Sequence, residues 1–379
     1  MWRSLHDAWW RLATQHHPTS CPDRLTSSVL TAGSIVYQAG VAARNANYDR
    51  HPARQVRLPC AVISVGNLTV GGTGKTACVE LVVRKLLARG RRVAVLSRGY
   101  GGPRRTYWLR ADQGRLVCDG QPVGEAGVWA DEPQLLARWL GGVPVVVGRR
   151  RDRTGRLACA KFGCDTIVLD DGFQHRQLHR DCDIVLVSAR MPPGGWPVLP
   201  RGPMREPLES LRRAEMVVLT KADDDWTAAN VLMERLRVLA PQAVSVVAAH
   251  EPMAIRSVPS GAVATPGSLA GQHVGLVSSI GDPQGFESTV QGLQASVLWH
   301  QVFPDHHPYR VNDWAMVLRQ AQATRPDAIL TTEKDWVRLA AVAHDRLPST
   351  TPVKLVEVRL KIVRGEEEFD ARLARVHAG

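Results

Sequence analysis

A glycine-rich loop between an apolar run and a helical pattern constrains the fold of this chain more than any other feature. Residues 60–65, CAVISV, are apolar and β-branched, which is typical of a buried parallel strand. After Leu87 and Ala88, Gly90 indicates the end of a helix that starts near residue 75. The connecting segment reads Thr69, Val70, Gly71, Gly72, Thr73, Gly74, Lys75, Thr76. Strand, glycine loop, Lys-Thr and helix is the arrangement that a P-loop requires.

The chemistry of that loop predicts a bound nucleoside triphosphate. Glycines let backbone N–H groups approach phosphate oxygens, and the helix N-terminus adds partial positive charge. Lys75 is predicted to reach the β- and γ-phosphates, and Thr76 to ligate magnesium. The strict pattern is not met, because Thr69 stands where the first glycine is usual. A plain glycine-rich turn between strand and helix is the alternative.

The remaining chain alternates strand-like and helical runs, which predicts an α/β fold with a P-loop NTPase-type parallel sheet flanked by helices. Predicted strands are 60–65, 92–97, 143–148, 165–170, 183–188, 215–220, 243–249, 273–279, 327–332 and 353–360. A stretch rich in Pro, Gly, Ser and Ala at 251–272 predicts the joint to a second unit. The predicted parts are an N-terminal region 1–58, a P-loop core 59–250 and a smaller α/β domain 251–379.

A second nucleotide signal is the run Thr166 to Leu169 followed by Asp170 and Asp171. An apolar strand that ends in aspartate places a carboxylate at the edge of the sheet beside the P-loop, where it holds magnesium. Asp170 is the predicted ligand. Asp171 is either a second ligand or a cap for the turn.

Composition points to an anionic partner in a reducing compartment. The formal net charge is +12, with a pI near 9.8. Such a charge suits nucleic acid, anionic lipid or a phosphorylated substrate. The seven cysteines are odd in number and form no CxxC pair, which favours the cytosol.

The N-terminal segment favours a membrane surface over nucleic acid. Residues 1–12 place Trp2, Leu5 and Trp9 on one helical stripe. Residues 25–43 carry no charge, although their Ser and Thr content makes them a poor spanning helix. The pattern predicts a helix in the membrane interface. An amphipathic helix packed on its own domain is the alternative.

Several longer sequence motifs match a known family. They are VGNLTVGGTGKT (65–76), SRGYGG (97–102), DEPQLLA (131–137), LDDGFQHRQLHRD (169–181), PMREPL (203–208), FPDHHPY (303–309) and TTEKD (331–335). In this order they resemble the tetraacyldisaccharide 4′-kinases, from the N-terminal helix to near residue 360. Thr69 fits that family's loop, whereas Ala77 departs from its common proline.

The resemblance implies an ATP-dependent, magnesium-requiring kinase. Its acceptor is the 4′-hydroxyl of a tetraacyldisaccharide 1-phosphate, and the product is the lipid A precursor lipid IVA. It also implies peripheral association with the anionic cytoplasmic face of the bacterial inner membrane, and no nucleic-acid partner. Two other classes stay open on the residues alone: a GTP-dependent switch or metallochaperone, and a basic nucleic-acid-binding ATPase.

The resemblance also assigns the catalytic pair. Asp131 begins a predicted helix and is the candidate base, and the alternative is that it only caps that helix. The matching family aspartate pairs with a histidine that corresponds to His306, and the adjacent His307 is the competing choice. Glu206 matches a family carboxylate near the metal, or is a surface charge.

Other candidate site residues have weaker sequence signals. His175 and His179 have the spacing of a helical metal pair but no evident third ligand. The tetrapeptide 220–223, TKAD, is similar to a guanine-reading loop. Arginines could bind the lipid phosphate or face solvent: Arg98, Arg104, Arg105, Arg149, Arg150, Arg151 and Arg153.

Overall fold

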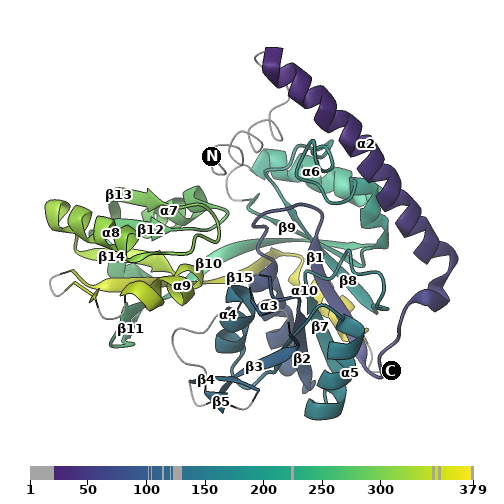
Figure 1. Cartoon of the computed structure of the whole chain (residues 1–379), viewed down its shortest axis with the longest axis horizontal. Helices are drawn as coiled ribbons and strands as arrows, with labels where there is room; N and C mark the ends of the chain where they lie inside the picture. The colour runs from purple at the N-terminus through teal and green to yellow at the C-terminus, as the bar shows by residue number, and fades with distance from the viewer. Residues whose placement is uncertain are drawn as a thin grey trace.

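The computed structural model describes residues 21–376, except 101, 104, 113, 114, 120, 123–129, 223–225, 344, 345, 349 and 350. The predicted helix at 1–12, Arg104 and the last residue of the TKAD tetrapeptide therefore lie outside the described residues. Within them, the strands join into one continuous sheet, and helices cover both of its faces (Figure 1).

The P-loop strand occupies the middle of a parallel sheet. The strands of this unit, in spatial order, are β10 (Val244–Val258), β9 (Met216–Thr220), β8 (Cys182–Ser188), β1 (Ala61–Asn67), β7 (Thr166–Asp170), β2 (Val93–Ser97) and β6 (Val145–Val147). β1 pairs in parallel with β7 and β8. Every residue of β1 is buried, because helices cover the sheet on both sides. The carboxyl ends of β1 and β7 thus meet at one edge.

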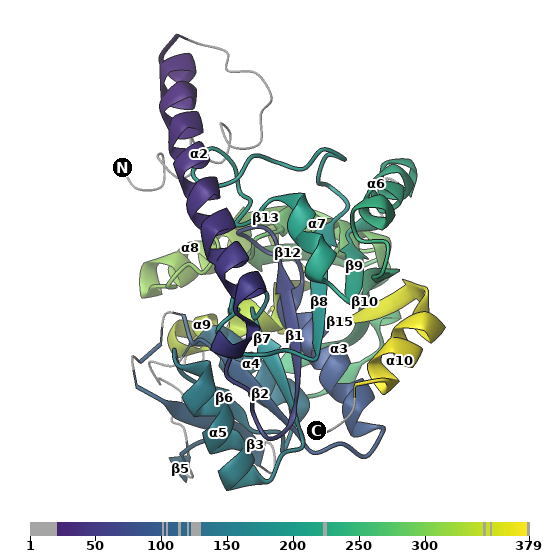
Figure 2. The same ribbon diagram turned by 90° about the vertical axis from the view of Figure 1, so that its right-hand side faces the viewer.

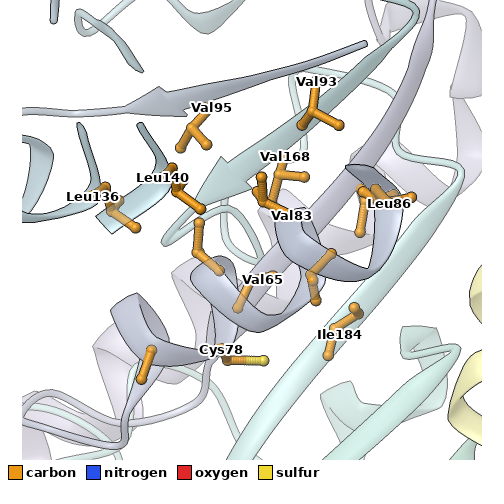
Figure 3. Packing of buried hydrophobic residues seen from close by; sticks show 14 of the residues in the cluster. Val65, Cys78, Val83, Leu86, Val93, Val95, Leu136, Leu140, Val168 and Ile184 are labelled. Carbon is orange, nitrogen blue, oxygen red and sulfur yellow. The ribbon is translucent and has the colours of Figure 1, made fainter. Parts of the chain in front are cut away.

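Alternation along β1 divides the core between the two faces. Ile63 and Val65 point toward α3 (Lys75–Leu87), α4 (Asp131–Leu140) and α10 (Glu366–Ala374). Val62 points to the other face, which α5 (Arg151–Phe162) covers. The short helix η2 (Leu208–Arg213) and α6 (Trp226–Leu239) cover the β8 and β9 part of that second face. Figure 3 shows Val83 and Leu86 of α3 against the strand residue Val168.

Three short strands extend the P-loop unit beyond β6. They are β3 (Tyr107–Asp112), β4 (Arg115–Cys118) and β5 (Gln121–Pro122), and they pair antiparallel. None of these was predicted from the sequence.

The second unit continues the same sheet. Its strands are β12 (His273–Ser278), β13 (Ser296–Val302), β14 (Ala328–Thr332) and β15 (Val353–Arg364), with β11 (Val263–Ala264) paired to β10. Its helices are η4 (Pro266–Leu269), α7 (Pro283–Gly292), α8 (Val311–Thr324) and α9 (Glu333–Ala343). β10 and β15 pair antiparallel over most of their lengths and run from one unit into the other (Figure 1).

The structure departs from the predicted division in two places. The boundary after residue 250 falls inside β10, because the strand continues through Pro252 with a shift in register there. The last segment also returns to the P-loop unit, where Phe369 and Leu373 of α10 are buried beside α3. Residues 365–376 therefore pack with the P-loop core and not with the smaller unit.

The N-terminal helix α2 (Cys21–Arg50) packs with one side on the P-loop unit. The short 3₁₀ helix η1 (Pro52–Arg54) follows it. The Ser34 hydroxyl donates to the carbonyl of Val198 at 2.8 Å, and the Tyr37 hydroxyl to that of Arg205 at 3.0 Å. The other side is open: Val29 is 66% exposed and Val36 is 74% exposed. Figure 2 shows the first half of α2 projecting past the body of the molecule. Among the described helices, none has the length and apolar character needed to cross a membrane.

Candidate active site

The predicted P-loop connects β1 to α3 as expected. Gly71 and Gly74 have φ of 99° and 87°, in the left-handed region that favours glycine. The Asn67 amide donates to the Thr73 hydroxyl at 2.8 Å, which holds the loop closed on the strand that precedes it. Lys75 and Thr76 begin α3, so both side chains lie at a helix N-terminus.

The first part of the loop has a different position. The Val70 N–H donates to the carbonyl of Pro203 at 2.8 Å, and Thr69 pairs with Met204. Gly71, Gly72, Thr73, Gly74, Lys75 and Thr76 line a large cavity, whereas Thr69 and Val70 are not part of its lining. The backbone that can surround a phosphate therefore starts at Gly71.

Asp170 ends β7 directly beside the P-loop. Its side chain is 3% exposed and accepts a hydrogen bond from the Ser97 hydroxyl at 3.1 Å. Burial, followed by the nearby carboxylates of Glu132 and Asp171, raises the pKa of Asp170 to about 7. A buried carboxyl with two anionic neighbours is a place where a cation is strongly favoured.

Asp171 has cations on both sides. The Arg205 guanidinium donates to both of its carboxylate oxygens at 2.8 Å, and Lys75 Nζ lies 3.8 Å from Oδ1. Although burial acts in the opposite direction, Lys75 and Arg205 hold the pKa of Asp171 below its usual value. This geometry ties the P-loop lysine to the carboxyl end of β7.

Glu206 lies apart from these groups. It is 2% exposed, and its carboxylate accepts hydrogen bonds from Arg213 at 2.8 Å and from Asn45 of α2 at 2.9 Å. It does not line the cavity. Thr76, Asp170 and Asp171 therefore line the same cavity, whereas Glu206 lies at the junction with the N-terminal helix.

Asp131 and His306 meet across the two units. Asp131 is the first residue of α4 on the P-loop side, and His306 lies in the loop after β13. His306 Nδ1 is 3.5 Å from Asp131 Oδ2. Both residues line the cavity that contains the P-loop.

The adjacent His307 faces the opposite way. Its Nε2 is 2.8 Å from Asp313 Oδ2, and its ring stacks on Phe303 with centroids 4.8 Å apart. It is 7% exposed and packs within the second unit. Of the two histidines, His306 is therefore the one placed to act with Asp131.

Three further charged residues lie at the site without having been assigned a role from the sequence. Glu132 adjoins Asp131, lines the cavity and forms a 3.6 Å ion pair with Lys334 of α9. Arg338, also of α9, has its Nε 3.3 Å from Asp131 Oδ2. Glu132 and Lys334 belong to the segments DEPQLLA and TTEKD, and Arg338 follows TTEKD by three residues, so membership of these segments was the available sequence signal.

The remaining candidates have other surroundings. Arg151 is buried and donates to the backbone carbonyl of Asp170 at 2.6 Å, whereas Arg98 lines the cavity. His175 and His179 lie in irregular segments rather than on a helix. No cluster of three or more His, Cys, Asp or Glu side chains in the described part of the chain could hold a metal by itself.

The cavity connects the P-loop with Asp170, Asp171, Asp131 and His306. Its volume is about 1330 Å³, and its lining comes from the P-loop, α4, α7, α9 and the loop that carries His306. Ligand pockets are commonly about 300–1,000 Å³, so there is room for more than a nucleotide. A P-loop, a buried carboxylate at the adjacent strand end and an aspartate–histidine pair facing both together define a P-loop phosphotransferase.

Comparison with known proteins makes this class specific. A family model described as tetraacyldisaccharide-1-P 4′-kinase matches residues 26–378. The chain belongs to this family.

Individual relatives agree with that assignment over nearly the whole chain. A tetraacyldisaccharide 4′-kinase of Anaeromyxobacter dehalogenans (strain 2CP-C) is 41% identical, over 98% of this chain and 94% of that protein. One from Syntrophus aciditrophicus (strain SB) is 40% identical, over 88% of this chain and 89% of its own. A solved structure of LpxK from Aquifex aeolicus in complex with ATP is 29% identical with a TM-score of 0.69, covering 93% of this chain and 99% of that one.

Proposed function

We propose that this chain transfers the γ-phosphate of ATP to the 4′-hydroxyl of a tetraacyldisaccharide 1-phosphate, which gives lipid IVA. The observation that carries the proposal is the meeting of Asp131 and His306 at 3.5 Å on the wall of the P-loop cavity. Membership of the family makes the chain a kinase and disfavours the GTP-switch and nucleic-acid classes.

The residues divide the work of phosphoryl transfer. The N–H groups from Gly71 onward and the Lys75 ammonium neutralise the charge that develops on the transferring group. Asp131 accepts the proton of the acceptor hydroxyl, and His306 orients its carboxylate from the second unit. The reaction needs no covalent intermediate on the protein, because alignment and charge neutralisation supply most of the rate.

The site fits magnesium. Thr76 and Asp170 supply hard oxygen donors, and burial of Asp170 beside the carboxylates of Glu132 and Asp171 favours a cation there. Asp171 is a weaker candidate because Arg205 and Lys75 already pair with it, and Glu206 is tied to Arg213. Magnesium bound with ATP takes most of its ligands from phosphate and water, which agrees with the small protein donor set. When bound, it neutralises charge on the β- and γ-phosphates.

We further propose peripheral association with the cytoplasmic face of the inner membrane. The acceptor is a lipid, and the open side of α2 presents Val29 and Val36 to the outside. The formal charge of +12 favours an anionic surface.

The catalytic proposal is tested by phosphate transfer from labelled ATP to purified disaccharide 1-phosphate lipid. We expect Asp131→Ala to lower kcat by about 10²–10⁴-fold, as for loss of a general base. ATP affinity, measured by calorimetry, should change little because the residue acts on the acceptor. His306→Ala should act in the same direction, and the double variant should be little worse than the worse single one.

A matched control is available on the second unit. His273 is an exposed histidine 3.8 Å from Asp327 and outside the cavity. His273→Ala should leave kcat within about twofold of the native value, as for a surface change. Full turnover by Asp131→Ala, or strictly additive losses from Asp131 and His306, would reject the assigned pair.

A further inference from the structure

Asp131 has a second partner from the opposite unit. Arg338 Nε lies 3.3 Å from Asp131 Oδ2, the same carboxylate oxygen that faces His306 Nδ1. The Arg338 guanidinium therefore faces Asp131 as an ion pair without a hydrogen bond from Nε, and with the imidazole it attracts the carboxylate toward the second unit.

Arg338 itself is held firmly. Its side chain is 9% exposed, and its guanidinium donates to Asp335 Oδ1 at 2.9 Å and to the Ser279 carbonyl at 3.2 Å. Asp335 and Arg338 are three residues apart on α9, so they lie on the same face of that helix. Few rotamers are open to an arginine with these partners, so its position next to Asp131 is preorganised.

The buried carboxylate of Asp335 is the centre of this arrangement. It is 0% exposed and accepts hydrogen bonds from the Ser279 N–H at 3.0 Å and hydroxyl at 2.6 Å. The hydroxyls of Thr332 and Tyr309 donate to it at 2.8 and 3.3 Å. A buried charge is costly unless its hydrogen-bonding sites are satisfied, and here the partners come from three separate segments.

Ser279 connects both partners of Asp131. Its carbonyl accepts the Arg338 bond and also the backbone N–H of His306 at 3.2 Å. Two residues further along, Gly281 lies against the P-loop: a Cβ on Gly281 would be 3.1 Å from the Gly72 nitrogen. The same segment therefore touches the phosphate loop and sets the places of Arg338 and His306.

We propose that Arg338 is a positioning residue for Asp131 and that Asp335 and the Ser279 carbonyl hold Arg338 in place. The proposal rests on the assignment of Asp131 as the base. Arg338 orients the Asp131 carboxylate and keeps a positive charge beside it when the two units meet. In this role it acts through Asp131 and not on the nucleotide, so its loss affects turnover and spares ATP binding.

The test measures kcat and the KM for ATP of Arg338→Met and Arg338→Lys, each alone and together with Asp131→Asn. Arg338→Met should lower kcat by about tenfold or more, with KM for ATP within about twofold. Arg338→Lys keeps the charge without the guanidinium fork, so its kcat should lie between those of the native protein and Arg338→Met. In the Asp131→Asn background, either Arg338 substitution should lower kcat by less than about twofold.

Several outcomes would overturn the proposal. An equal loss in the native and Asp131→Asn backgrounds would mean that Arg338 acts on the phosphoryl group directly or supports the fold generally. A native kcat in Arg338→Met would mean that it does not act in turnover. If Arg338→Met does not fold by circular dichroism, the two Arg338→Lys comparisons decide between the same outcomes.

The controls separate this inference from the proposed function. Arg256 is an arginine of the second unit that pairs with Glu357 outside the cavity, and Arg256→Met should leave kcat nearly unchanged. Near-native turnover in Asp131→Asn alone would reject the assigned base. A large loss in Asp131→Asn together with no coupling to Arg338 would reject the positioning role alone.

Discussion

At the scale of single residues, two neighbouring histidines have different surroundings. His306 has φ of 57°, and this left-handed turn of the backbone separates its direction from that of the next residue. His306 reaches Asp131, whereas His307 stacks on Phe303 and bonds Asp313. Composition and spacing cannot distinguish adjacent histidines, because both have the same chemistry. The alignment of FPDHHPY with the family motif favoured His306, and the geometry gives the physical reason.

The environment of His175 predicts a pH dependence of stability. Burial, together with the cations Arg151, Arg180, Arg44 and Arg98, lowers the pKa of His175 to about 4. The unfolded chain has the ordinary value of 6.5 and binds a proton first as the pH falls. Stability from this residue is therefore present above pH 6.5 and is lost as pH falls toward 4, by up to about 1.4 kcal/mol per pH unit.

Chemical denaturation between pH 7.5 and 4 checks this expectation. The free energy of unfolding of the native protein should fall more steeply over that window than that of His175→Gln, which cannot take up the proton. His51→Gln serves as a control for the loss of an exposed histidine. Parallel curves for the native protein and His175→Gln would show that the ring is not held neutral.

At the scale of elements, the sequence predicted the strands that are buried on both faces. Strands β1, β7 and β9 are buried at every residue and consist mainly of apolar side chains, which is a strong pattern. β13 was missed because it is a partly exposed edge strand in which apolar and polar residues mix. β3 was missed for a related reason, since its sequence YWLRAD is short and contains charges. The predicted strand 243–249 stops before the stretch 251–272 rich in Pro, Gly, Ser and Ala, whereas β10 bulges at Pro252 and continues to Val258.

The residues of the candidate site also differ in how far local sequence predicts them. Local motifs predicted Lys75, Thr76 and Asp170, because a P-loop and a strand that ends in aspartate are defined within a few residues of sequence. Arg338 was not predicted, since its contact with Asp131 depends on how two distant helices meet. Periodicity and spacing carry no information on such long-range contacts.

The helix α2 yields a prediction about membrane binding. Val29 and Val36 are seven residues apart, so they lie on one side of the helix, and both are more than half exposed. The combined change Val29→Glu and Val36→Glu should weaken co-sedimentation with phosphatidylglycerol vesicles by about tenfold or more. Activity on detergent-solubilised acceptor should be kept, because Ser34 and Tyr37 still hold α2 on the P-loop unit.

Val238 of α6 offers a matched control, since it is a 72% exposed valine on another helix. Val238→Glu should leave vesicle binding unchanged. Equal loss from the α2 and α6 variants would indicate a general charge effect, and no loss from the α2 variant would favour a helix that only packs on its own domain.

At the scale of the whole molecule, the site exists only where the two units meet. β10 and β15 join the units covalently, while Asp282 at the start of α7 forms ion pairs with Arg190 at 2.7 Å and Lys221 at 3.0 Å. Although burial opposes it, Lys221 and Arg190 lower the pKa of Asp282. These pairs lie on the wall of the cavity, next to the contact between Gly281 and the P-loop. Together they stabilise an arrangement in which Asp131 and His306 can meet.

Loss of the Asp282 charge should therefore open the molecule. Asn is also a good N-cap, so Asp282→Asn keeps the helix start that the Asp282 side chain makes with Gly285 while it removes both ion pairs. Each partly exposed pair contributes about 0–1 kcal/mol, so the closed population should fall by up to about 30-fold. We expect kcat/KM to fall by up to that factor. The radius of gyration with a bound ATP analogue, measured by small-angle X-ray scattering, should rise.

High salt should lower the activity of the native protein more than that of Asp282→Asn, because salt screens the native ion pairs. Glu251→Gln, which breaks an exposed pair with Lys361 between β10 and β15, controls for the loss of one carboxylate. If Asp282→Asn keeps the native radius and the native kcat/KM, these ion pairs do not hold the two units together.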